Sequence, residues 1–153
     1  MEKTLNQLMS ELQIIAQSHL QIREFFQGDF IDAVSRDSVT YPLMVATLQP
    51  GSMTTSGINV NMIISMCDKY NIQEYRQINE IHSDCLQILN DIRITLKQWR
   101  FTEFLDINGD ISTTPFINRG PDVTAGWTMN LNVTIYDNDN WCAIPYDDYD
   151  FGN

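Results

Sequence analysis

The sequence is poor in basic residues and lacks any long apolar run. Its 153 residues include nine Lys and Arg against 20 Asp and Glu, which gives a formal charge of -11. A surface this acidic repels phosphate, so a protein that wraps nucleic acid directly is disfavoured. The longest apolar runs, such as residues 43–46, fall far short of the roughly 18 residues that a membrane-spanning helix needs. We therefore expect no membrane partner.

Cysteine is scarce, and the three present are widely spaced: Cys67, Cys85 and Cys142. Without a C-x-x-C pair, neither a disulfide framework nor a zinc site is indicated, and we expect buried free thiols. The N-terminal stretch MEKTLNQLMSELQ is polar every few residues, which is not the pattern of a signal peptide. Synthesis in a reducing cytoplasm is the expectation.

Sequence motifs of catalysis are also missing. The chain contains no G-x-G-x-x-G, P-loop, H-E-x-x-H or G-x-S-x-G pattern. The stretch DINGD at residues 106–110 has its glycine in the wrong place for a calcium loop, so it predicts a tight type I′ hairpin turn at Asn108-Gly109. His19 and His82 have no triad partners at suitable spacing. We expect no enzyme activity, no cofactor and no metal; a hydrolase using scattered carboxylates is the weakest alternative.

The most informative feature is a long amphipathic pattern at residues 73–98. Its apolar positions recur every three or four residues, and no Pro or Gly interrupts them, which predicts one long helix. The predicted buried stripe contains Ile78, Ile81, Cys85, Ile88, Ile92 and Leu96, widened by Leu86 and Leu89. A helix with one apolar stripe requires a sheet or a second helix to cover it.

The first half of the chain supplies such partners. Residues 3–20 show a second amphipathic helical pattern, and residues 28–39 read as an extended region with a polar turn. Residues 41–48 and 58–66 predict two strands. The small-residue stretch QPGSMTTSG at 49–57 predicts a flexible loop between them.

Three further strands are expected after the long helix. Residues 101–107 and 111–117 flank the Asn108-Gly109 turn, and residues 126–136 alternate apolar with polar side chains. The resulting order predicts an α+β fold with an antiparallel sheet of about five to six strands and two helices packed on one face. Residues 1–145 would form this single domain, followed by an acidic aromatic tail at 146–153.

Several segments occur in a consistent order across residues 5–145. They are Tyr41-Pro42-Leu43-Met44-Val45, residues 79–91, Pro115-Phe116, Arg119, Asp122, Ala125-Gly126-Trp127 and Trp141-Cys142-Ala143-Ile144-Pro145. Together they resemble structural proteins of tailed bacteriophages. The similarity is to neck or tail ring subunits of crAss-like phages and their relatives, and to the tail terminator, or tail completion, proteins.

The resemblance implies a non-enzymatic virion protein of the neck or tail, made in the bacterial host cytoplasm. It would form a homo-oligomeric ring, a hexamer or dodecamer, at the head-tail connection. The expected neighbours are the portal, an adaptor or adjacent tail and neck proteins. DNA would pass through the channel without specific binding, which suits a chain with surplus acid.

Two segments are longer than a single domain requires, and they predict subunit contacts. The candidate interface residues are Pro50, Gly51 and Met53 in the loop and Tyr146, Tyr149 and Phe151 in the tail. We expect both segments to be mobile in a monomer and ordered in a ring. The alternative function is a small acidic binding module, either a DNA mimic or an inhibitor of a host protein, which would stay monomeric or dimeric.

Overall fold

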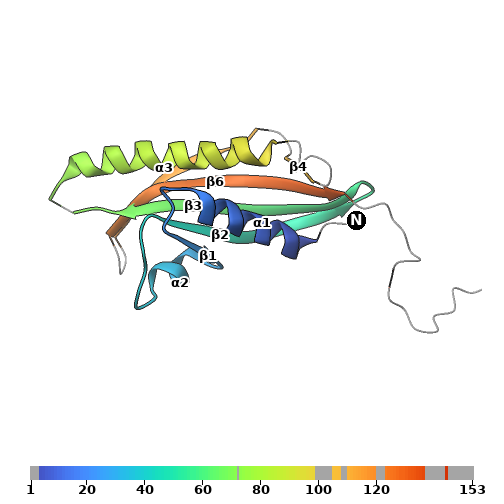
Figure 1. The fold of residues 1–153 in the computed structure, drawn as a ribbon, viewed down its shortest axis with the longest axis horizontal. Helices are drawn as coiled ribbons and strands as arrows, with labels where there is room; N and C mark the ends of the chain where they lie inside the picture. Colours follow the sequence, from blue (N-terminus) through green and yellow to red (C-terminus); the bar gives the residue numbers. More distant parts are fainter. Residues whose placement is uncertain are drawn as a thin grey trace, which may run out of the picture.

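The structure, a computed structural model, describes residues 4–71, 73–98, 105–107, 110–119, 123–136 and 144. Within these residues the chain forms three helices and six strands in an α+β arrangement (Figure 1). The helices are α1 (Leu5–Ser18), α2 (Phe30–Val34) and α3 (Tyr75–Leu96). The strands are β1 (Glu24–Gln27), β2 (Leu43–Thr54), β3 (Gly57–Lys69), β4 (Leu105–Ile107), β5 (Thr113–Arg119) and β6 (Val123–Tyr136).

All six strands belong to one sheet with the order β1-β2-β3-β6-β4, in which β5 also pairs with β6. The long strand β3 pairs antiparallel with both of its neighbours, β2 and β6, as predicted. The expectation of a wholly antiparallel sheet is wrong, because β1 pairs with β2 in parallel. A parallel neighbour requires a crossover connection, and the chain between β1 and β2 contains α2.

Both long predicted helices are confirmed, and they share the main core on one face of the sheet (Figure 1). A capping box starts α1, because the Thr4 hydroxyl accepts from the Gln7 backbone and the Gln7 amide accepts from Thr4. The α3 stripe is buried as predicted from Ile81 to Leu96, except that Leu86 is 38% exposed, and Ile78 is only partly buried. The stripe is therefore narrower than the sequence pattern indicates. Its sheet partners include Val60, Met62, Ile64, Met66, Met129, Leu131, Val133 and Ile135.

The segment predicted as extended at residues 28–39 instead contains the five-residue helix α2. A helix this short has no repeating apolar pattern for sequence reasoning to detect. It buries Ala33 and Val34 against the opposite face of the sheet, where Leu43, Val45 and Cys67 form a second, smaller core. Among the described residues, the helix that covers this face is α2, at one end.

The flexible loop predicted at residues 49–57 is also wrong. Strand β2 continues to Thr54, and only Thr55 and Ser56 connect it to β3. The strand accommodates Pro50 and Gly51 in an irregularity between Gln49 and Ser52, where the register with β3 shifts. Beyond Ala46, the edge of β2 that faces away from β3 has no partner among the described strands. The N–H that Pro50 lacks therefore costs no hydrogen bond between strands on that edge.

The hairpin predicted around Asn108-Gly109 does not form. Both β4 and β5 pair antiparallel with β6, so they run in the same direction along its edge and do not pair with each other. Strand β6 spans 14 residues and offers enough edge for both segments. Asn108 and Gly109 themselves lie outside the described residues.

Candidate subunit interface on the hairpin and the open sheet face

The structure places half of the predicted interface residues on one rigid feature. Pro50, Gly51 and Met53 are all exposed and belong to β2 near its turn into β3. Tyr146, Tyr149 and Phe151 lie outside the described residues. The exposed segment is therefore a strand extension and not the flexible loop that the composition indicates.

The end of this hairpin carries an apolar surface, which we call the hairpin patch: Leu48, Met53 and Ile58. Their exposed fractions are 44%, 84% and 40%. Ile58 is paired with Met53 on β2 and with the buried Ile135 on β6, so the patch continues the side of the sheet that α1 and α3 cover farther along. Figure 1 shows the β2–β3 turn at the end of the sheet, beyond the end of α3.

Neighbouring backbones approach closely at two glycines of this hairpin. Gly57 has φ +148°, and a Cβ there would lie 2.1 Å from the carbonyl oxygen of Ile135. At the irregularity, a Cβ on Gly51 would lie 2.3 Å from the carbonyl oxygen of Asn59. Both glycines allow neighbouring backbones to approach more closely than any side chain permits.

The opposite face of the sheet, away from α1 and α3, is lined by uncharged polar side chains from β2, β3 and β6. They hydrogen-bond across the strands in short ladders. The contacts are Asn59 Nδ2 to Ser52 Oγ at 3.3 Å, Thr134 Oγ1 to Asn59 Oδ1 at 2.7 Å, Asn61 Nδ2 to the Pro50 carbonyl at 2.8 Å and Asn130 Nδ2 to Ser112 Oγ at 2.9 Å. Side chains held by one another in this way present a preformed surface.

Charge is excluded from these strands. Residues 38–67, which include the whole of β2 and most of β3, contain no Asp, Glu, Lys, Arg or His, and neither does β6. In a chain with a formal charge of -11, the hairpin and the open sheet face are the surfaces with the least electrostatic cost of burial.

A groove lies on the open face where α2 meets the sheet. Its volume is 390 Å³, and Phe30, Ile31, Ile63 and Phe116 provide apolar lining, with Thr47 and Thr128 among the polar groups. The rings of Phe30 and Phe116 meet edge to face, with centroids 5.2 Å apart, and close one wall. A second depression of 400 Å³ shares Gln49 and Ile63 with the groove and extends it along the sheet. Each depression has one carboxylate, Asp29 and Asp110 respectively.

Ionisable groups gather elsewhere, near the start of α3. Burial raises the pKa of the Cys85 thiol to about 12, and the carboxylates of Asp68 and Asp84 add to the shift. A thiol with so high a pKa is a poor nucleophile. His82 lies nearby with its Nε2 3.2 Å from the Phe116 carbonyl, while its own carbonyl accepts from Trp127 Nε1 at 2.8 Å. These contacts attach α3 to β5 and β6.

Neither a metal-binding set nor a membrane span is found in the part of the chain that the structure describes. No three His, Cys, Asp or Glu side chains there could share a metal ion. None of the described helices is long and apolar enough to cross a membrane. Cys67 and Cys85 are buried thiols, as predicted, whereas Cys142 lies outside the described residues.

No protein-family model matches this chain, and no curated protein matches it.

Sequence reasoning missed the groove, because it is assembled from α2, β2, β3, β5 and β6. One signal was available in the sequence: the uncharged run at residues 38–67 stands out in so acidic a chain. This run corresponds to strands that carry no charged side chain on either face of the sheet.

Proposed function

We propose that the protein is a structural ring subunit of the neck or tail of a tailed bacteriophage, with a tail terminator or completion role and no enzymatic activity. The sequence resemblance suggests this role, and the charge-free hairpin and open sheet face support it. Copies of a chain with a formal charge of -11 repel one another, so they can associate closely only through surfaces that carry little charge.

The distribution of charge also suits a ring around DNA. Most carboxylates of the described residues lie on helices, on short connections and near the ends of strands, and they include Glu11, Asp32, Asp37, Glu80 and Asp84. Once the neutral surface is buried between copies, the remaining surface is acidic. A channel lined by such groups lets DNA pass without trapping its phosphates.

The alternative role, an acidic DNA mimic or host-protein inhibitor, has less support. A mimic of DNA needs regularly spaced carboxylates on one face, but the broad open face of the sheet carries amides and hydroxyls. The two roles also differ in assembly, because a mimic acts as a monomer or dimer.

The test is the mass of the purified protein in solution, measured by light scattering over a range of concentrations, followed by electron microscopy. The ring proposal expects a hexamer or dodecamer with a central hole, and antibodies to the chain should label the neck or tail of virions. A monomer or dimer that binds a host protein and is absent from virions would overturn it.

The tail contributes to the proposal through Tyr146, Tyr149 and Phe151. A triple alanine variant keeps the acidic charge and removes the apolar groups, so we expect weaker assembly with an unchanged fold. The matched control is Asp147, Asp148 and Asp150 changed to Asn, which removes charge and keeps the aromatic rings. Equal assembly of the triple alanine variant and the wild type would exclude the tail from the interface.

A further inference from the structure

The hairpin patch and the groove beside α2 lie on opposite faces of the sheet. The patch is on the side of the sheet that carries α1 and α3, whereas the groove is on the side that carries α2. Along β3, Ile63 and Ser65 of the groove are six and eight residues from Gly57, roughly 20 to 26 Å at the rise of a strand. Because the strands of the hairpin are paired into this sheet, its patch cannot reach the groove on the other face of its own chain.

From this placement we propose that the hairpin patch of one copy occupies the groove of the next copy, head to tail. This inference rests on the proposed ring function and names the two surfaces that meet. A contact between two different surfaces of one chain is heterologous, and repeating it produces a closed ring when the rotation closes. Two faces of one sheet, used in this way, are sufficient to build a cyclic assembly.

The two surfaces fit chemically. Met53 is 84% exposed, unbranched and flexible, and it lies two residues before the β2–β3 turn. The groove has apolar walls at Phe30, Ile31 and Phe116, and its volume of 390 Å³ falls in the range of pockets that enclose a ligand.

Electrostatic repulsion favours the hairpin over the C-terminal tail as the segment that occupies the groove. The groove contains Asp29, and the depression that continues it contains Asp110. The tail at 146–153 carries Asp147, Asp148 and Asp150, which these carboxylates would repel. Residues 48–58 carry no charge, so the hairpin enters the groove without that penalty.

The experiment introduces one acidic group into each surface. Met53→Asp alters the patch and Ile31→Asp alters the groove; both positions are exposed, so circular dichroism and melting should match the wild type. Each variant should lower the association constant by about thirtyfold or more, the effect of a hot-spot residue. The matched control is Leu20→Asp, because Leu20 is an apolar residue that is 94% exposed and belongs to neither surface.

Mixing the variants tests the head-to-tail geometry directly. A Met53→Asp copy retains a normal groove and an Ile31→Asp copy retains a normal hairpin, so an equal mixture should form a 1:1 heterodimer and stop there. A mixture that stays monomeric, or variants that assemble like the wild type, would overturn the contact while leaving the ring function in place. A wild type that is monomeric at every concentration would overturn both.

Deleting the C-terminal tail distinguishes the hairpin from the tail as the occupant of the groove. Deletion of residues 146–153 should leave the Met53→Asp and Ile31→Asp effects unchanged. If the deletion abolishes assembly, and neither substitution weakens assembly of the full-length chain, the tail occupies the groove and the proposal is wrong.

Discussion

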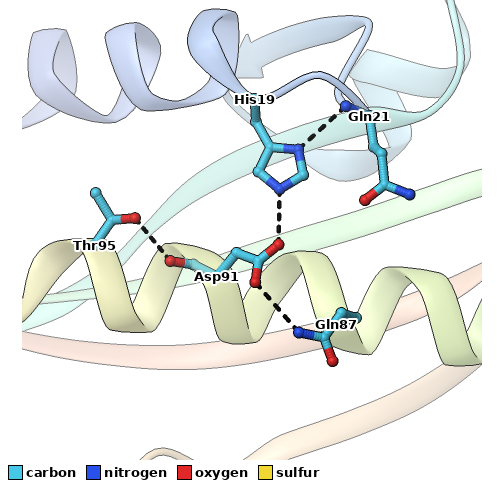
Figure 2. Close-up of polar contacts among 5 residues, drawn as sticks. All are labelled: His19, Gln21, Gln87, Asp91 and Thr95. Atoms are coloured by element: carbon cyan, nitrogen blue, oxygen red, sulfur yellow. Dashed lines mark hydrogen bonds and ion pairs between the residues drawn. The ribbon is translucent and has the colours of Figure 1, made fainter.

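The imidazole of His19 connects the two long helices, with its Nε2 2.9 Å from a carboxylate oxygen of Asp91 (Figure 2). On the other side of the ring, Nδ1 accepts a hydrogen bond of 3.2 Å from the backbone N–H of Gln21. Because Nδ1 accepts, the ring proton lies on Nε2 and donates to Asp91, so a neutral histidine is sufficient. The amide of Gln87 donates to the second carboxylate oxygen of Asp91 at 3.3 Å and holds it in place.

A double-mutant cycle of His19→Ala and Asp91→Ala should show a coupling of about 0.2–1 kcal/mol in urea unfolding, since the side chain of Asp91 is 39% exposed. Pairing His19→Ala with Glu80→Ala, an exposed position on the same helix, should give additive effects. A zero coupling for the first pair would show that the contact adds nothing to stability.

Cys85 should resist thiol reagents in the folded protein. Its side chain is buried on the covered face of α3, and its pKa is raised to about 12, so almost no thiolate is present at pH 8. In a Cys142→Ser background, mass spectrometry should find Cys67 and Cys85 unlabelled until denaturant is added. Rapid labelling of Cys85 without denaturant would contradict the assignment of the α3 stripe.

Asp68 should limit stability at neutral pH. Burial raises the pKa of its carboxyl group and the charge of Asp84 adds to this, against a hydrogen bond from the Lys69 backbone that lowers it. The folded state therefore holds the proton longer than the unfolded state, and the free energy of unfolding falls as pH rises past the ordinary value of 3.8.

Asp68→Asn should accordingly be more stable than the wild type at pH 7, with a difference that shrinks toward acid. Urea unfolding at several pH values measures it, and Asp37→Asn, at an exposed position, serves as the control. A loss of stability at pH 7 would mean that the carboxylate has a stabilising partner that outweighs its burial.

Gly57→Ala should destabilise the protein by about 1–3 kcal/mol, because φ is +148° and the added Cβ would meet the Ile135 carbonyl oxygen. For a chain of this length the melting temperature should fall by about 2–4 °C per kcal/mol. Ser56→Ala, one residue earlier in the exposed turn, should melt like the wild type. An unchanged melting temperature for Gly57→Ala would place the turn elsewhere.

The sequence by itself determined the elements with regular periodicity. The stripe of α3 around Cys85 and Ile88, and the alternation of β3 and β6, could be predicted because one buried face imposes a period of 3.6 on a helix and 2 on a strand. The α+β class and the placement of α1 and α3 on one face follow from those patterns.

Only the tertiary structure decided which strands pair and where they turn. Pro50-Gly51 has turn composition, yet it lies within β2, because this side of the strand has no described partner there and a register shift absorbs the extra residue. Asn108-Gly109 favours a hairpin locally, but β4 and β5 both pair with β6 along its edge. The groove depends on five elements meeting, and contacts between residues far apart in the chain leave no local pattern to read.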